Sequence, residues 1–287
     1  MGTSAAWPPA CPRSPSPAGR TRPARRTCSP TVRRRWRWWS GLGQDPARRS
    51  ELGPLGPAFA QVHVVSPLGP PKAIADLGAY EARDNPDAGQ PGAAVDTNPT
   101  ALARRGATRV AIDAGGNTLL RVGPGGAIAT LAVFDTRLAD APPFLGLPPG
   151  TRIPMQSVPT SVAPGPDGSW YVGELTGFPF PVGAARVMSV SPGSAPVVVA
   201  EGFTNVMDVA VDRAGGLWVL EIATKGLLSG DDAGALVRVA PDGTRTTVLT
   251  AGLHAPGGLA VGRRGEVYVS NYGGSAARGE VLRVTPE

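Results

Sequence analysis

Short apolar runs separated by glycine-rich and proline-rich turns recur along most of this chain. The clearest copy is TSVAPGPDGSWYVGELTG, residues 160–177, in which two apolar runs flank the turn Gly165-Pro166-Asp167-Gly168. Gly and Asp tolerate the positive φ that a tight turn needs and Pro fixes its own φ, so this stretch predicts a β-hairpin. Similar stretches are VAVDRAGGLWVLEI at 209–222, LAVGRRGEVYVSNY at 259–272 and, more weakly, LARRGATRVAIDA at 102–114.

The four copies end on polar residues at one position of the pattern: Asp113, Glu174, Glu221 and Asn271. Their separations of 61, 47 and 50 residues are near the roughly 40–50 residues of propeller-type repeats. The first three copies continue with two more strand-like runs, and the last copy continues with one. The pattern therefore predicts an all-β fold, a β-propeller of four-stranded antiparallel blades, with about four and a half blades in this chain.

The predicted boundaries divide the chain at residue 40. Residues 1–40 are expected to be disordered, and residues 41–287 are expected to form the propeller domain. Within it, a partial second blade at 41–79 precedes blades at about 98–135, 158–202, 205–252 and 255–287. Asp45 followed by Pro46 predicts the start of a short helix, and the polar stretch 80–99 is expected to be a loop. Trp170 and Trp218 are expected at equivalent positions in the core between blades.

Loop lengths distinguish the two ends of the predicted blades. When the strands of a blade are called A to D, the A–B and C–D connections are tight, whereas the B–C and D–A connections are long. Residues 135–158 and 175–185 are examples of the long kind. In an antiparallel blade all the long connections lie on one face, which we call the loop face. Binding residues commonly collect on such loops, so we expect a small molecule or a protein to bind there.

The positive charge of the chain lies in one segment. The net charge is +6, but residues 1–40 hold nine Arg and no acidic residue, which leaves 19 basic and 22 acidic residues elsewhere. We therefore expect no nucleic-acid partner for the domain. No apolar run reaches the roughly 18 residues of a membrane-spanning helix, so no membrane partner is expected. Cys11 and Cys28 also lie in the first segment and do not report on the redox compartment of the domain.

Residues 1–40 have an unusual composition, rich in Arg, Pro and Ser. They contain no apolar core of roughly 7–15 residues, so no signal peptide is recognisable. An arginine-rich arm that binds nucleic acid is the alternative. Trp has the single codon TGG, and residues 35–40, RWRWWS, become the strand-like VAVVVG when GC-rich codons are re-read one frame over. We therefore interpret this segment as translated out of frame.

The domain resembles the ScyD/ScyE family. The stretch 158–187, VPTSVAPGPDGSWYVGELTGFPFPVGAARV, carries most of the likeness, and residues 41–49, 74–86, 143–150, 221–231 and 255–271 match as well. The resemblance implies a six-bladed, NHL- and gluconolactonase-like propeller in a family whose members look exported. It also implies that a closing strand, a first blade and part of the second are absent. We therefore expect an N-terminally truncated or frameshifted chain that self-associates through unclosed blades.

Oxygen-bearing side chains collect where the inner strands meet the loop face. The candidate ligand-binding residues are Asp113, Glu174, Glu221 and Asn271 at the ends of B strands, with Asn98 and Asp208 at the starts of A strands. Carboxylate and amide oxygens suit Ca²⁺, for which Glu174, Glu221 and Asp208 are the candidate metal ligands. The alternative is structural, with each acid accepting hydrogen bonds from the backbone of its own B–C loop.

A binding or scaffold protein is the function we expect. The main alternative is a metal-dependent lactone or ester hydrolase of the gluconolactonase-like type, in which a bound ion activates water. A further alternative is a non-functional truncated product. The domain has no Cys and no GxSxG serine, so no catalytic residue is assigned and an enzyme is the less favoured class. We expect His63 to be half-buried in a strand and His254 to hydrogen-bond in a turn.

Overall fold

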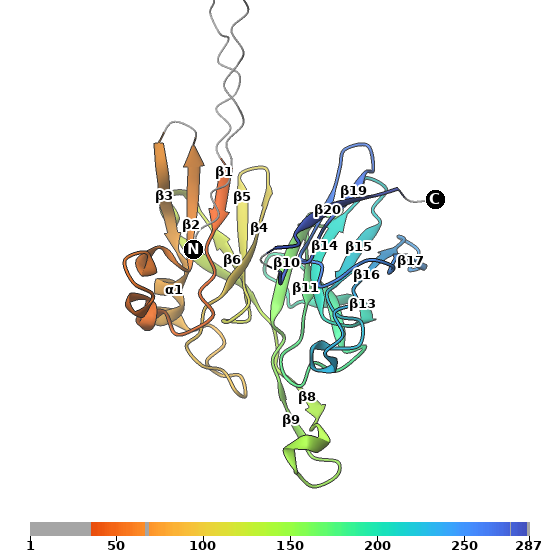
Figure 1. Cartoon of the computed structure of the whole chain (residues 1–287). Helices are drawn as coiled ribbons and strands as arrows, with labels where there is room; N and C mark the ends of the chain where they lie inside the picture. Colours follow the sequence, from red (N-terminus) through yellow and green to blue (C-terminus); the bar gives the residue numbers. More distant parts are fainter. Residues whose placement is uncertain (1–35, 67–68, 276, 286–287) are drawn as a thin grey trace, which may run out of the picture. The chain divides into compact units, whose positions relative to one another are not determined.

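The computed structural model describes residues 36–66, 69–275 and 277–285, which form successive antiparallel sheets along the chain (Figure 1). Sheet 1 contains β1 (Trp36–Trp39), β2 (Gln61–Ser66) and β3 (Gly69–Asp76). Sheet 2 contains β4 (Pro99–Arg105), β5 (Thr108–Asp113), β6 (Thr118–Val122) and β7 (Ile128–Val133). Sheet 3 contains β10 (Pro159–Pro164), β11 (Trp170–Glu174), β12 (Ala185–Val190) and β13 (Val197–Phe203).

The last two sheets complete the series. Sheet 4 contains β14 (Val206–Val211), β15 (Leu217–Glu221), β16 (Ala235–Val239) and β17 (Arg245–Leu249), and sheet 5 contains β18 (Gly258–Val261), β19 (Val267–Asn271) and β20 (Glu280–Val284). A two-stranded ribbon of β8 (Arg137–Asp140) and β9 (Arg152–Met155) is inserted between sheets 2 and 3. The helical segments are α1 (Leu77–Asp84) and the short 3₁₀ turns η1 (Pro46–Leu52), η2 (Gly56–Ala58), η3 (Pro124–Gly126), η4 (Pro143–Leu145) and η5 (Leu227–Ser229).

The all-β propeller architecture expected from the sequence is confirmed. In sheets 2 to 4, four strands follow one another in sequence order, each antiparallel to the next, and the predicted runs fall within them. The start of the predicted short helix is also found, since the Asp45 side chain accepts a hydrogen bond from the Ala47 backbone at the start of η1. Among the described residues, no helix has the length and apolar character needed to cross a bilayer.

Two segments differ from the sequence expectation. Part of the predicted loop 80–99 belongs to α1, which begins after Asp76 because this carboxylate accepts a hydrogen bond from the Ala79 backbone. Residues Trp36–Trp39 were expected to be disordered, yet they form β1 and pair with β2 from Trp36↔Val65 to Trp39↔Val62. Backbone pairing tolerates many sequences, and aromatic residues favour extended backbone. The remaining residues of that segment, 1–35, lie outside the described part, so their disorder and reading frame stay predictions.

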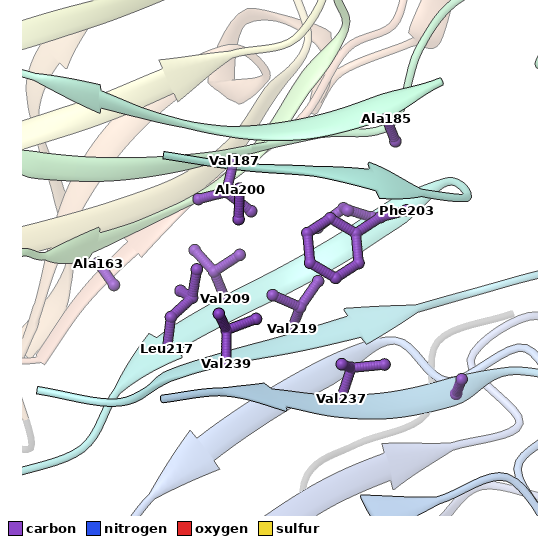
Figure 2. Packing of buried hydrophobic residues seen from close by; sticks show 12 residues of the cluster. Ala163, Ala185, Val187, Ala200, Phe203, Val209, Leu217, Val219, Val237 and Val239 are labelled. Atoms are coloured by element: carbon purple, nitrogen blue, oxygen red, sulfur yellow. The ribbon is translucent and has the colours of Figure 1, made fainter. Parts of the chain in front are cut away.

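The core lies between neighbouring sheets rather than within one sheet. Figure 2 shows side chains of β10, β12 and β13 facing those of β14, β15 and β16, with Phe203 among Val209, Val219 and Val237. A second cluster joins sheets 2 and 3, and a third joins sheets 4 and 5. Neighbouring sheets approach closely at Gly173 in β11, where an added Cβ would lie 2.8 Å from a methyl of Val206. Each sheet is therefore stabilised by its neighbours, as in repeat architectures.

Trp170 and Trp218 are both buried, but they do not occupy equivalent positions. Trp170 begins β11 opposite Pro164, whereas Trp218 is the second residue of β15 and lies opposite Ala210. Successive side chains of a strand point to opposite faces. Trp170 accordingly packs toward sheet 2, and Trp218 packs toward sheet 5. The expected equivalence is wrong by one residue, and Tyr171 is the counterpart of Trp218.

Candidate functional site

The polar residues that end the second strand of sheets 2 to 5 have a common role. Asp113 is fully buried and accepts hydrogen bonds from Thr97 Oγ1 at 2.5 Å and from the Asn98 backbone N–H at 2.6 Å. Both donors lie in the segment that enters β4. The Gly116 backbone adds a longer bond of 3.3 Å. Burial raises the pKa of Asp113 to about 6, although these hydrogen bonds oppose the rise. Asp113 thus fastens the start of β4 to the end of β5.

Glu174 lies at the centre of a charged network in sheet 3 and is fully buried. Arg186 of β12 donates to it from Nε and Nη2 at 2.9 and 3.0 Å, and Arg137 of β8 donates from Nη2 at 2.8 Å. Ser157, just before β10, donates at 2.9 Å. Arg137 also donates to the Ala184 carbonyl at 2.9 Å, so the β8–β9 ribbon is joined to the loop after β11. Two guanidinium groups already neutralise this carboxylate, which disfavours a cation there.

Glu221 and Asn271 repeat the anchoring role in sheets 4 and 5. Glu221 Oε1 accepts a hydrogen bond of 2.5 Å from the Thr204 backbone, two residues before β14. Burial raises the pKa of Glu221. Asn271 Oδ1 accepts a bond of 2.7 Å from the His254 backbone, and its Nδ2 donates to the Gly252 carbonyl at 2.8 Å. The uncharged amide of Asn271 therefore anchors the entry to the first strand in sheet 5, as a carboxylate does in sheets 2 to 4.

Asn98 and Asp208 act in two different places. Asn98 contributes its backbone to Asp113, and its side-chain oxygen lies 2.6 Å from the position of a Cβ added at Gly41. Asp208 Oδ2 accepts a hydrogen bond of 2.7 Å from the Leu259 backbone, which links β14 to β18 of the next sheet. Burial raises the pKa of Asp208 to about 6. Asp208 is therefore a connection between two sheets.

The six candidate residues are spread over sheets 2 to 5, with Asn98 and Asp113 at sheet 2 and Asp208 and Glu221 in sheet 4. The side chains of Asp113, Glu174, Glu221, Asn271 and Asp208 are engaged by hydrogen bonds within the protein, and Asn98 is bonded through its backbone N–H. In residues 36–66, 69–275 and 277–285, no group of three or more His, Cys, Asp or Glu side chains is placed to hold a metal ion. The hydrogen bonds agree with a structural role, with one correction. Most donors come from the segment that enters the first strand of the sheet, rather than from the loop after the second.

A buried acidic residue of α1 escaped the sequence analysis. Glu81 is 2% exposed, and burial together with the negative charges of Asp113, Asp87 and Asp96 raises its pKa to about 8. When the Asn85 amide is oriented with its nitrogen toward the two carboxyl groups, it donates to Glu81 Oε1 at 3.1 Å and to Asp87 Oδ1 at 3.0 Å. Glu81 is consequently protonated near neutral pH. Its position in a segment expected to be a loop explains why no pattern marked it.

The two histidines have structural surroundings. His63 is 7% exposed, more buried than expected, and its Nε2 lies 3.1 Å from the Ala58 carbonyl. His254 stacks on Tyr272 with ring centroids 5.3 Å apart, and its Nδ1 lies 2.9 Å from Asp232 Oδ1. His254 therefore joins two loops, as its position in a turn predicted.

Exposed apolar side chains distinguish the loop face. The large apolar residues exposed in its connections are Val95, Leu138, Phe144, Leu145, Leu147, Phe178, Val182, Leu227 and Leu228. Three rings form a continuous row, with Phe178 lying 6.2 Å from Phe144 and 6.3 Å from Phe180 between centroids. Gly226, just before η5, lies close to Phe180 and Val182. The ribbon tip, the loop after β11 and η5 thus share one apolar surface, which we call the loop-face patch.

Comparisons with known proteins identify the fold. No protein-family model and no curated protein sequence matches this chain. The chain is similar to a chain of the nidogen/laminin complex, with 14% identity over 78% of this chain and 74% of the other and a TM-score of 0.52. It is also similar to a gluconolactonase from Xanthomonas campestris, with 17% identity over 79% and 68% of the two chains and a TM-score of 0.48.

A third solved structure is virginiamycin B lyase from Staphylococcus aureus, with 13% identity over 78% of this chain and 62% of the lyase and a TM-score of 0.47. The chain spans less than two thirds of this lyase and of several other solved structures that it matches. The similar structures include a second protein described as a putative gluconolactonase. At these identities the likeness shows the fold alone.

Proposed function

We propose that this chain is a ScyD/ScyE-type propeller that binds a partner protein through its loop face. The observation that carries the proposal is the loop-face patch. Of the 16 large apolar side chains exposed in the described residues, nine lie in the long connections of this one face. Exposed apolar side chains that gather in one place mark interaction surfaces. Phe144, 69% exposed, and Phe178, 38% exposed, are the aromatic anchors.

The shape of the patch favours a protein over a small molecule. Phe144 lies in the connection between β8 and β9, so it is carried at the tip of a ribbon that projects beyond the blades (Figure 1). Small-molecule sites are concave and lined by the protein, whereas a projecting aromatic residue suits insertion into an apolar groove of a partner. Arg137 fixes the base of the ribbon through Glu174 and Ala184. The aromatic residues are thereby presented on a rigid support.

The test is a selection of peptides from a displayed random library against the folded chain. Peptides rich in apolar residues should be enriched. Their Kd should rise at least about tenfold in Phe144→Ser/Phe178→Ser. The matched control is Val197→Ser/Val199→Ser, which removes two exposed apolar side chains from β13 outside this face. Enriched peptides that bind both variants alike, or no enrichment, would overturn the proposal.

The same protein and variants also test the alternative that the chain is a metal-dependent hydrolase. Incubation with gluconolactone and Ca²⁺ should give no hydrolysis above the uncatalysed rate. Turnover that requires Ca²⁺ and survives the double Phe substitution would assign the chain to the hydrolase class instead.

A further inference from the structure

A short segment after α1 holds both ends of the connection that carries the β8–β9 ribbon. This segment, residues 85–92, is called the strap. Just before β8, the Thr136 backbone donates a hydrogen bond of 3.0 Å to the Gln90 side chain of the strap. Just after β9, Gln156 Nε2 donates to the Gly92 carbonyl at 2.9 Å. The ribbon therefore begins and ends against the strap.

Buried polar side chains fix the strap in place. Asp87 is 1% exposed, and its Oδ2 accepts a hydrogen bond of 2.9 Å from Asn117 Nδ2. Asn117 Oδ1 in turn accepts a bond of 3.0 Å from the Val158 backbone, just before β10. The Asn85 amide, in the orientation given above, joins Asp87 to Glu81 of α1. The position of the strap is thus tied both to α1 and to the entry of β10.

The surroundings of Glu81 are acidic. The charged groups that act on it most strongly are Asp113 at the end of β5, Asp87 in the strap and Asp96 before β4. Within the described residues, Asp96 Oδ1 is buried without a hydrogen-bond partner, and so is Oγ1 of Thr118, which lies opposite Asp113 in the sheet. This site therefore accommodates Glu81 as a neutral acid and disfavours its carboxylate.

Ionisation of Glu81 adds a charge that its own helix does not compensate. The pKa of about 8 for Glu81 exceeds that of about 6 for Asp113, so Glu81 loses its proton when Asp113 is already charged. The single cation of α1, Arg83, is exposed and already paired with Asp84. Tyr80 holds the first turn of α1 in the core. The end of the helix and the strap are consequently the parts that can carry Glu81 toward solvent.

We propose that the proton on Glu81 controls whether the strap supports the ribbon, and that partner binding at the loop-face patch therefore weakens as pH rises above neutrality. The inference rests on the proposed function, since the site that it regulates is the loop-face patch. With the proton in place, the strap holds both ends of the connection that carries Phe144. After loss of the proton the strap detaches, and the ribbon keeps its bond from Arg137 to Glu174. The ribbon is then loosened without being unfolded.

The first test needs no partner. Hydrogen exchange followed by mass spectrometry would compare residues 85–92 and 134–158 at pH 7 and pH 9, after correction for the intrinsic exchange rate. Because the pKa of Glu81 is about 8, its protonated fraction falls about tenfold over this interval, and the protection of both segments should fall by about the same factor. Glu81→Gln has no proton to lose and should keep its protection. The matched control is Asp84→Asn, which removes an exposed acid of the same helix and should behave like the unmodified chain.

The second test measures binding. The probe is an acetylated and amidated peptide from the loop-face selection that contains no ionisable side chain. Its Kd for the unmodified chain should rise about threefold to tenfold between pH 7 and pH 9, because the binding-competent fraction falls. Its Kd for Glu81→Gln should stay constant.

The outcomes separate this inference from the proposed function. Protection of the strap that persists at pH 9, an equal loss of protection in Glu81→Gln, or a peptide Kd that does not change with pH would refute the control by Glu81 and leave the loop-face site standing. A fall in protection that Glu81→Gln abolishes, without any enriched peptide, would refute the proposed function and confirm that Glu81 holds the strap.

Discussion

Replacing Glu174 by Gln tests the buried charge network of sheet 3. The substitution keeps the side-chain size but removes the negative charge that faces two arginines. The Glu174 side chain is fully buried, whereas the Arg137 and Arg186 side chains are 29% and 19% exposed. Removing one partner of a buried ion pair costs about 3–5 kcal/mol. Because both arginines reach some solvent, we expect the lower end, about 3 kcal/mol.

This loss converts into a shift that is easily measured. For a domain of about 250 residues, 1 kcal/mol lowers the Tm by roughly 2–4 °C. Circular dichroism melting at pH 7 should therefore give a Tm roughly 6–12 °C below that of the unmodified chain. The matched control is Glu221→Gln, at the equivalent strand end. Its side chain accepts a backbone hydrogen bond from Thr204, which Gln can also accept, so about 1 kcal/mol or less is expected.

The comparison of the two variants tests whether charge or shape matters at these positions. Urea unfolding should give the same order, with a difference that persists in high salt because the Glu174 carboxylate is shielded from solvent. If Glu174→Gln and Glu221→Gln unfolded within about 1 kcal/mol of each other, the ion pairs would contribute no more than ordinary hydrogen bonds. The assignment of Glu174 as the organising charge of sheet 3 would then be wrong.

Two other predictions concern pH and packing. The folded chain holds protons on Glu81 and Asp113, with pKa values of about 8 and about 6, that the unfolded chain releases near the ordinary values of 4.5 and 3.8. The free energy of unfolding should therefore fall as pH rises from about 5 to 8.5. In Glu81→Gln, the upper part of this pH dependence should become flatter. An unchanged slope of unfolding free energy against pH in that variant would contradict the raised pKa of Glu81. Gly173→Ala should lower the free energy of unfolding in urea by about 1–3 kcal/mol, because its Cβ would crowd Val206 and Val209. Gly183→Ala is the control: its Cβ meets no atom within 4 Å, so it tests only the effect of a positive φ in an exposed loop.

The repeat pattern predicted the strands well because each turn carries its own local signal. The Gly-Pro-Asp-Gly turn at 165–168 and its counterparts define where strands end, and alternation defines the faces. The pattern also found the equivalent strand-end residues. It could not find their partners, because Arg137 is 37 residues from Glu174 and comes from an inserted ribbon.

Elements with weak local signals were missed. The helix α1 has only eight residues, with Leu77 and Tyr80 as its buried apolar positions, which is too little periodicity to detect. The strand β1 depends on an available edge of β2 rather than on its own pattern. The apolar loop-face patch was not predicted as a whole, since its residues are scattered over three connections that only the fold brings together.

The hydrogen bond that joins the end of each second strand to the entry of the first strand determines how far the connections between sheets can vary. The connections that precede β10, β14 and β18 contain 25, 2 and 8 residues, respectively. Each is fastened by Glu174, Glu221 or Asn271 at a residue two to four positions before the next strand, so that strand starts at a fixed place whatever the length before it. Because this hydrogen bond fixes where the first strand begins, the length and sequence of the preceding loop can change while the blade keeps its position. Foreign loops could replace the ribbon tip at 141–151, which leaves Arg137 and Ser157 bonded to Glu174, without altering the register of the blade that follows.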